Sequence, residues 1–362
     1  MSDCKKLRLD KEGLEDMLNG ATLLGSGGGG PIAIGEQVIE KILKTGKAPK
    51  VADAEDMPDD AWAVIAAGVG SPDAAGGFDP TVASDAVRAM EKQMGITIDY
   101  IMAAEIGAGN TFMPLFVADD MGITALNVAG SSRAVPAITM STFSADKVPV
   151  DQMMVANHNQ QVGISVKWAA DASNPMRAVI SDPAFGQIAG LAIWPMQGKT
   201  VKKSAIRSTY NKAQELGAKL RQGIKDGHPV EAVCDHLGGK VIADGKLVSH
   251  SESTAGGFDM GRVTVETGDG AELIVLNKNE NLIAWRSDRS HPVTIGPDLV
   301  SYMTRDGKVF SNVLIPEHVG KDMVVIASPA GEHMRKEGIV AEFRSVLAGM
   351  GYPGPATKLD EL

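Results

Sequence analysis

Three short glycine-marked stretches in the first 140 residues constrain the fold of this chain more than any other feature. They are Leu24-Gly25-Ser26-Gly27-Gly28-Gly29-Gly30-Pro31, Glu105-Ile106-Gly107-Ala108-Gly109-Asn110 and Gly130-Ser131-Ser132-Arg133-Ala134-Val135-Pro136. Each lies where one predicted element ends and the next begins. Glycine is used where the backbone takes a positive φ or comes close to a ligand. Three such turns predict three loops that meet at one edge of a sheet, where open α/β folds bind ligands.

The first half of the chain alternates between helix and strand patterns. The spacing of apolar residues predicts helices over residues 10–24, 32–45, 80–94 and 110–121, and strands over 62–67, 100–104 and 123–127. Such alternation is typical of a parallel sheet with right-handed crossovers. We therefore predict a Rossmann-like α/β domain over residues 1–165.

Residues 166–362 form the second predicted domain, which is β-rich from about residue 239. A mixed region comes first, with a strand at 190–194 and a helix over 209–225. Short strands follow at 241–243, 246–248, 262–266, 272–276, 282–285 and 323–327, separated by turn dipeptides such as Asp-Gly. This spacing predicts a small barrel or swivel-like β domain, followed by a helix over residues 337–349.

Composition excludes several classes of partner. The net charge of −10 argues against nucleic acid, which needs a basic surface. Two cysteines are too few for a disulfide framework or a Cys-based zinc site. The chain has neither a run resembling a signal peptide nor an apolar run of about 18 residues, so we expect a cytoplasmic protein without a membrane partner. A homo-oligomer is expected only as the commonest case among proteins of this kind.

The glycine-rich loop after the first predicted helix is a candidate binding site. Its backbone N–H groups could hold an anion or a polar ring, which makes Ser26, Gly27, Gly28, Gly29 and Gly30 candidate substrate-binding residues. The loop follows a helix rather than a strand and lacks the Lys-Ser/Thr of a P-loop. We therefore expect no nicotinamide or flavin. The alternative is a flexible linker between two helices.

The second and third stretches carry polar side chains suited to chemistry. Glu105, at the end of a predicted strand, could act as a general base or metal ligand, or could cap the following helix. Asn110 could orient a substrate carbonyl or cap its own helix. Arg133, with Ser131 two residues before it, is a candidate anchor for a carboxylate, and a structural salt bridge is the alternative.

His158, in the polar run Asn157-His158-Asn159-Gln160, is the best single histidine for metal binding or proton transfer, although a lone histidine is more often structural or exposed. No His-x-x-x-His pair is present, so spacing reveals no zinc site. If a divalent metal binds, zinc is the first expectation, with Glu105 and His158 as candidate ligands. No Gly-x-Ser-x-Gly motif marks a nucleophilic serine.

These segments resemble the S-methyl-thiohydantoin desulfurase-like family, long catalogued as a domain of unknown function beside hydantoinases. The matching pieces are the three glycine-marked stretches together with Gly70-Ser71-Pro72, Asn279-Glu280-Asn281-Leu282-Ile283-Ala284-Trp285 and Gly296-Pro297-Asp298-Leu299-Val300. They span most of the chain in the expected order. The resemblance implies an N-terminal Rossmann-like domain and a C-terminal β domain.

One departure concerns the third stretch. Members of the family carry acidic residues before its glycine and after its proline, whereas Asn127, Val128, Ala129 and Ala137 are uncharged here. If those carboxylates hold a metal or serve catalysis, this protein lacks them and belongs to a subfamily with another substrate or ligand set.

The resemblance implies hydrolysis of a small heterocyclic substrate of the thiohydantoin type, with or without a carboxylate arm, giving a hydantoin and hydrogen sulfide. Glu105 would then activate water, directly or through a metal, and the N–H groups of residues 27–30 would hold the developing charge. Asn110 and Arg133 would orient the ring or the arm. Two alternatives stay open. One is a non-catalytic subunit of a hydantoinase or carboxylase complex, and the other is a nucleotide-binding oxidoreductase.

Overall fold

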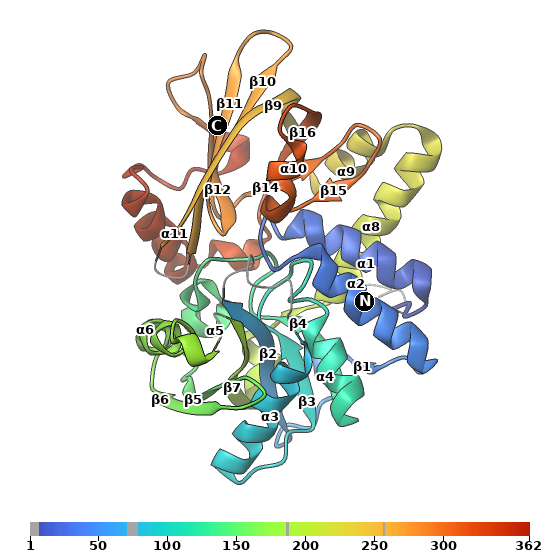
Figure 1. The fold of residues 1–362 in the computed structure, drawn as a ribbon, viewed down its shortest axis with the longest axis vertical. Helices are drawn as coiled ribbons and strands as arrows, with labels where there is room; N and C mark the ends of the chain where they lie inside the picture. The colour runs from blue at the N-terminus through green and yellow to red at the C-terminus, as the bar shows by residue number, and fades with distance from the viewer. Residues whose placement is uncertain (1–6, 71–78, 186–187, 256–257) are drawn as a thin grey trace.

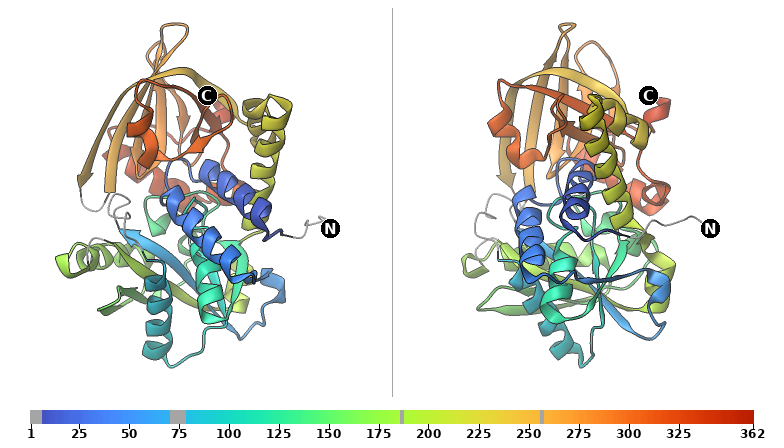
Figure 2. Two further views of the ribbon diagram at one scale, coloured as in Figure 1. Left: turned by 45° about the vertical axis from the view of Figure 1, so that its right-hand side comes forward. Right: turned by 90° about the vertical axis from the view of Figure 1, so that its right-hand side faces the viewer.

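The fold has two lobes, each built on one β-sheet (Figure 1). We analysed it as a computed structural model, which describes residues 7–70, 79–185, 188–255 and 258–362. The lower lobe in Figure 1 holds the first sheet, and the upper lobe holds the second. The N-terminal helices lie between the lobes on one side, as the turned views of Figure 2 also show.

The first sheet has the strand order β1-β4-β3-β2-β7-β5-β6, with β8 beside β4. Its strands are β1 (Lys50–Ala52), β2 (Trp62–Gly70), β3 (Tyr100–Ala103), β4 (Thr124–Ala129), β5 (Asp151–Ala156), β6 (Gln161–Val166), β7 (Ile188–Gln197) and β8 (Ile206–Arg207). The run from β1 to β2 pairs in parallel, which confirms the predicted parallel sheet. From β2 outward the pairing through β7, β5 and β6 is antiparallel, and the last two strands form a hairpin with a short turn.

Helices cover this sheet on both faces. They are α1 (Lys11–Leu24), α2 (Ile32–Thr45), α3 (Thr81–Met94), α4 (Met113–Met121), α5 (Thr142–Ala145), α6 (Ala169–Ile180), α7 (Gly198–Ser204) and α8 (Thr209–Asp226). The next helix, α9 (Pro229–Leu237), packs against α8 and the second sheet instead. Strand β2 shows why both faces need cover. Val64 packs in the core beneath α3 and α4, and its neighbour Ile65 packs in the core on the opposite face, with α6.

Helices α1 and α8 cross at two glycines. A Cβ at Gly20 would lie 1.8 Å from the carbonyl oxygen of Ala213, and one at Gly217 would lie 1.8 Å from that of Asp16. Only glycine permits this approach. Arg221 then clasps Asp16 with two hydrogen bonds of 2.8 and 2.9 Å. The chain passes from α8 through α9 into the second sheet. This crossing therefore packs α1 against the segment that connects the two lobes.

The second sheet is antiparallel throughout, with the order β13-β12-β11-β10-β9-β16-β14-β15. Its strands are β9 (Lys240–Ala255), β10 (Phe258–Thr267), β11 (Glu272–Lys278), β12 (Glu280–Arg286), β13 (Pro292–Ile295), β14 (Leu299–Met303), β15 (Val309–Phe310) and β16 (Asp322–Ser328). Helices α10 (Ile315–His318) and α11 (Glu337–Gly349) follow or interrupt it. The sheet curves into a half-barrel, which confirms the predicted β-rich fold class.

The prediction of two separate strands at residues 241–243 and 246–248 is wrong, because both belong to the single long strand β9. The Asp244-Gly245 pair reads as a turn but lies inside that strand. Gly245 is paired with Thr267 on one side and Met323 on the other. A Cβ at Gly245 would lie 2.0 Å from the carbonyl oxygen of Glu266, so the glycine marks a close approach of strands.

The first sheet includes β7 and β8, which follow residue 165, and the domain division at residue 165 stays a prediction.

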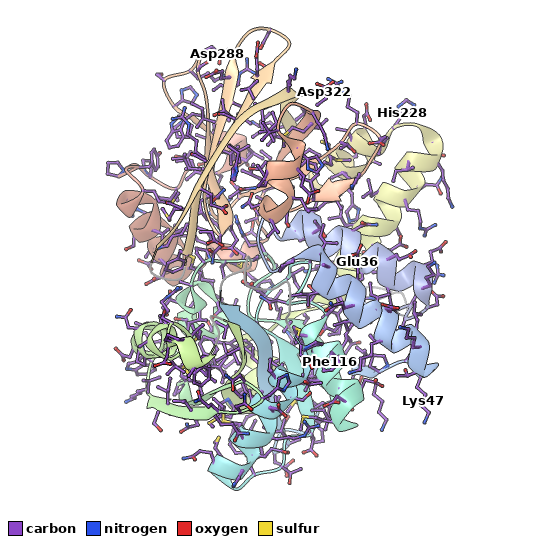
Figure 3. All side chains as sticks on the ribbon, viewed as in Figure 1. Glu36, Lys47, Phe116, His228, Asp288 and Asp322 are labelled. Carbon is purple, nitrogen blue, oxygen red and sulfur yellow. The ribbon has the colours of Figure 1, made fainter. Side chains whose placement is uncertain are left out.

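Figure 3 shows the side chains on the ribbon. Phe116, on α4, is buried in the same core as the apolar face of α2, and the Lys41 ammonium lies 4.0 Å from the centre of its ring. Among the described helices, none is long and apolar enough to cross a membrane.

Candidate active site

A cavity of about 390 Å³ lies where the three glycine-marked stretches meet. From the lower lobe it is lined by residues 27–30, by Glu105 and Asn110, and by Val135 to Ala137. The second stretch follows β3 and the third follows β4, so both lie at the carboxyl edge of the parallel strands. The upper lobe adds Asn279, Glu280 and Asn312. The predicted meeting of the three loops is confirmed, and the cavity lies between the two lobes.

The glycine-rich loop is held from both lobes through its carbonyl groups. The carbonyl of Ser26 accepts from the backbone N–H of Asn281 at 2.7 Å, and that of Gly27 accepts from Asn312 at 2.9 Å. The carbonyl of Gly29 accepts from the backbone N–H groups of Gly109 and Asn110, at 2.9 and 3.0 Å. The alternative of a flexible linker does not fit a loop anchored at three carbonyls.

Positive φ angles explain the glycines of this loop. Gly27, Gly29 and Gly30 have φ values of 88°, 79° and 90°. Gly28 is needed for space instead, because a Cβ there would lie 2.1 Å from Oε1 of Glu280. The Gly28 N–H donates to the carbonyl of Gly25 at 3.0 Å, so this group is already used within the loop.

Ser26 and Ser131 lie behind the cavity rather than on its wall. The Ser26 hydroxyl accepts from the backbone N–H of Val300 at 2.9 Å, and that of Ser131 donates to the carbonyl of Arg133 at 2.6 Å. Both side chains are completely buried. They hold backbone segments in place and are not among the residues that line the cavity.

Glu105 lies on the cavity wall and is buried. Its Oε1 accepts from the Asn110 side-chain amide at 2.9 Å, and its Oε2 accepts from the Val135 backbone N–H at 2.8 Å. Neither donor is a backbone N–H of α4, so the carboxylate does not cap that helix. Burial raises the pKa of Glu105 to about 7, against the lowering effect of these two hydrogen bonds and of the Arg133 charge. A carboxyl group with this pKa exchanges a proton readily near neutrality.

Glu280 is a second buried carboxyl on the same wall, and sequence reasoning assigned it no role. It is 3% exposed and begins β12, after the hairpin residue Asn279 with φ of 60°. Its Oε2 has no hydrogen-bond partner among the described residues. Burial raises the pKa of Glu280 well above its ordinary value, and the neighbouring Glu105 charge raises it further. The available signal was the polar triplet Asn279-Glu280-Asn281 between two strand patterns.

Arg133 is fully buried, and its guanidinium is surrounded by backbone carbonyls. Nε donates to Ala134 at 2.9 Å, Nη1 to Pro297 and Asp298 at 2.8 and 2.7 Å, and Nη2 to Asn281 at 3.0 Å. Burial lowers its pKa to about 10, against the opposite effect of Glu280, Asp298 and Glu105. Arg133 is not among the residues that line the cavity, and its bonds join the lower lobe to the upper one.

The structure does not bring His158 to this cavity. The side chain lies in the turn between β5 and β6 and is 52% exposed. Its Nε2 lies 3.5 Å from Oδ2 of Asp79, and its Nδ1 lies 3.6 Å from Oδ2 of Asp85. The two candidate metal ligands, Glu105 and His158, are therefore in different places.

A divalent metal stays a prediction. Within the described ranges, no three His, Cys, Asp or Glu side chains come together in a way that could hold a metal ion. The unpartnered oxygens at the cavity are Oε2 of Glu280 and Oδ1 of Asn312, which are hard donors. They do not fit the His and Cys ligands that zinc prefers, and we derive no step through a metal.

Among the uncharged positions at the third stretch, Asn127 has structural partners. The Asn127 amide donates to Oδ1 of Asp53 at 3.0 Å and to Oδ1 of Asn211 at 2.5 Å, and its own Oδ1 accepts from the backbone N–H of Tyr210 at 2.9 Å. Ala129 is buried in β4. Of these positions, Ala137 is the one that lines the cavity, so an acidic residue there would change its charge directly. Ser71, in the matching Gly70-Ser71-Pro72 segment, lies outside the described residues.

The remaining wall of the cavity is largely apolar, with Val69, Met113, Met176, Leu191 and Trp194. At the side of the upper lobe, Arg177 of α6 stacks on the ring of Phe258, with its guanidinium carbon 3.5 Å from the ring centre. Glu252 and Asp259 line the same side. A planar, partly apolar ligand fits such a wall, with its polar groups toward Glu105, Asn110 and Glu280.

Two models of one protein family match this chain in succession. The model described as "S-Me-THD-like, N-terminal domain" matches residues 12–167, and that described as "S-Me-THD-like, C-terminal domain" matches residues 167–342. No curated protein matches. Among solved structures, a crystal structure of a protein from Chromobacterium violaceum is similar, with 29% sequence identity and a TM-score of 0.83, over 96% of this chain and 98% of the other.

Proposed function

The chain belongs to the S-methyl-thiohydantoin desulfurase-like family, and on that premise we propose that it removes sulfur hydrolytically from a thiohydantoin-type ring. The products would be a hydantoin and hydrogen sulfide. The observation that carries this proposal is Glu105, a buried carboxyl group with a pKa of about 7 on the wall of a cavity of suitable size. Cavities of a few hundred Å³ are typical for small ligands.

In the proposed reaction, water adds to the carbon of the C=S group while Glu105 takes one of its protons. A tetrahedral adduct forms with oxygen and sulfur on the same carbon. The C–S bond then breaks, the C=O bond forms, and sulfur leaves as hydrogen sulfide. The overall reaction joins one ring thione and one water to give one ring carbonyl and one hydrogen sulfide, with no oxidant or reductant.

Substrate orientation would fall to the groups around Glu105. Asn110 fixes one oxygen of the carboxyl group and the Val135 N–H fixes the other, so the base is held before the substrate arrives. The glycine-rich loop gives the ring access to backbone because its residues 27–30 carry no side chains. Arg133, with its nitrogens bound to carbonyls, is a weaker choice for anchoring a carboxylate arm than Arg177 on the cavity wall.

The test is sulfide release and hydantoin formation from a set of thiohydantoins that differ in ring substituent. Wild-type protein should turn over at least one of them. Glu105→Gln should reduce turnover by about 10² to 10⁴-fold, the usual contribution of a general base. The amide is isosteric, so the Val135 N–H keeps an acceptor and the Asn110 amide can rotate to accept. Glu272→Gln, on the exposed side of β11, is the matched control.

Elemental analysis of the same preparation decides whether a divalent metal takes part. Full turnover in Glu105→Gln would show that Glu105 is not the base. Absence of sulfide from every ring tried would favour the accessory-subunit alternative, which predicts turnover only when a ring-opening partner is added.

A further inference from the structure

The carboxyl group of Glu280 packs directly against the backbone of Gly28. Gly28 lacks the Cβ that would lie 2.1 Å from Oε1 of Glu280, so the loop and the carboxyl group fit only in this combination. The same hairpin is fixed on either side, by Asn312 donating to the carbonyl of Asn279 at 2.7 Å and by the backbone N–H of Asn281 donating to Ser26. The backbone on both sides of Glu280 is therefore immobilised against the loop that lines the cavity.

This carboxyl group has an unused oxygen, which is unusual for a buried polar atom. A buried polar atom without a partner costs stability. The nearby carboxylate of Asp298 shows the ordinary arrangement. Its Oδ1 accepts from Ala330 and Arg335, and its Oδ2 accepts from the backbone N–H of Leu359 at 2.8 Å. In contrast, none of the described residues donates a hydrogen bond to Oε2 of Glu280.

Two neighbouring carboxyl groups in one site do not both ionise readily. Glu105 accepts hydrogen bonds on both oxygens, and these favour its charged form. The hydrogen bonds that favour the charged form of Glu280 come only from the backbone N–H groups of Gly29 and of Glu280 itself, while the Glu105 charge opposes its ionisation. Arg133 favours the charged form of both, and Asp298 faces Arg133. The other charged groups on the cavity wall are Arg177, Glu252 and Asp259. In this arrangement Glu105 loses its proton first, and Glu280 keeps its own.

A neutral carboxylic acid has an O–H that needs an acceptor, and the described residues supply none for Oε2. Oε2 itself is enclosed, but Glu280 lines the cavity, so a turn of the carboxyl group about its last bond would present the O–H to a ligand atom there. We propose that Glu280 is a second catalytic residue, a neutral acid that gives its proton to the ring sulfur while Glu105 takes a proton from water. This inference rests on the proposed function.

The proton balance closes over the two steps. In the first, Glu105 gains a proton from water, the C–O bond forms, and the sulfur gains the proton of Glu280. In the second, the hydroxyl group of the adduct returns a proton to Glu280 as the C=O bond forms. The C–S bond breaks, and the departing HS⁻ takes the proton held by Glu105 and leaves as hydrogen sulfide. Both carboxyl groups end in their starting state.

The first measurement is infrared spectroscopy of the full chain at about pH 8, above the pKa of Glu105. A neutral carboxylic acid has a C=O stretching band separate from that of carboxylates. We expect this band in the wild type and in Glu105→Gln, and we expect its loss in Glu280→Gln. Addition of hydantoin, the product, should shift the band because the ring accepts the hydrogen bond. A band that persists in Glu280→Gln overturns the inference, and so does the absence of any such band in the wild type.

The second measurement is the pH profile of sulfide release from 2-thiohydantoin. The wild-type rate should rise as Glu105 ionises and fall again when Glu280 ionises. Glu280→Gln should lower kcat by about 10²-fold or more and lose the falling limb, with hydantoin affinity within a few-fold of wild type. Glu280→Asp, which keeps an acid, should recover part of the rate. A Glu280→Gln protein that folds and keeps the full rate overturns the inference.

The two measurements separate this inference from the proposed function. A wild type that releases no sulfide but shows the Glu280 band shifting with hydantoin would refute the desulfurase reaction and retain a neutral acid that donates to a ring ligand. A wild type that releases sulfide without the band would refute the role of Glu280 and retain Glu105 as the base.

Discussion

Arg133 and Glu280 are both buried ionisable groups between the lobes, and they differ in how their polar atoms are used. All three side-chain nitrogens of Arg133 donate hydrogen bonds, and together they bind four backbone carbonyls. Glu280 has an oxygen with no partner among the described residues. A buried group whose bonds are complete contributes to folding, and one whose bonds are incomplete is available to a ligand. The contrast separates the residues that hold the lobes from those that face the cavity.

The largest expected effect follows from removing Arg133. Arg133→Met deletes every bond to the carbonyls and leaves Glu105, Glu280 and Asp298 without their common cation. Breaking such a buried arrangement costs about 3–5 kcal/mol. Urea unfolding followed by circular dichroism should show this loss. The control, Arg305→Met, removes a half-exposed arginine and should leave the midpoint almost unchanged. A stable Arg133→Met protein would break the comparison.

The pH dependence of stability tests the carboxyl groups that face the cavity. The folded-state pKa of Glu105, about 7, lies above its ordinary value, so the folded state holds this proton more tightly than the unfolded state. The contribution is complete below about pH 4.5 and is lost as pH rises through 7, a change of about 3 kcal/mol. Glu105→Gln lacks this loss. Its free energy of unfolding should therefore increase relative to that of the wild type between pH 5 and 8. A difference that does not vary with pH would contradict the raised pKa.

Gly28→Ala should disturb the fit between the loop and Glu280. The new methyl group would lie 2.1 Å from Oε1, so the carboxyl group must move, at a cost of about 1–3 kcal/mol. Sulfide release should fall more than stability does, because the displaced group is the proposed acid. Gly349→Ala is the control, since no atom lies within 4 Å of its added Cβ. Unchanged turnover in Gly28→Ala would argue against a catalytic Glu280.

The smallest expected effect comes from His158→Asn. This histidine is exposed and approaches only Asp79 and Asp85 among the described carboxylates. Substitution should change neither sulfide release nor the urea midpoint, because exposed ion pairs contribute little. Loss of turnover in this variant would bring His158 back as a candidate acid or metal ligand.

The elements that the sequence predicts well are those set by local periodicity. The helix over residues 32–45 is such a case, because apolar residues at helical spacing face one core and Gly46 ends the helix with a positive φ. The split of β9 failed because the conformation of Gly245 depends on two neighbouring strands that lie elsewhere in the sequence.

The site was predictable only in part, for a related reason. Glu105 and Asn110 are five positions apart and share one loop, so a local pattern could reveal them. Glu280 reaches the cavity through a hairpin bonded to the glycine-rich loop, and the bond from Ser26 to Asn281 spans 255 positions. The side-chain type of Arg133 suggested an anion, but its partners are backbone carbonyls, and three of the four lie 148 to 165 positions away. No local pattern encodes such partners.

The anchoring of the glycine-rich loop has a consequence for how the whole chain unfolds. The carbonyl of Asn281 accepts from Arg133, its backbone N–H donates to the carbonyl of Ser26, and its side-chain amide donates to the carbonyl of Val300 at 2.9 Å. One residue of the upper lobe therefore joins segments from both lobes. Neither lobe can lose its structure without leaving buried donors and acceptors of the other unpaired. The two lobes should therefore melt in one cooperative calorimetric transition, although two family models match the chain in succession.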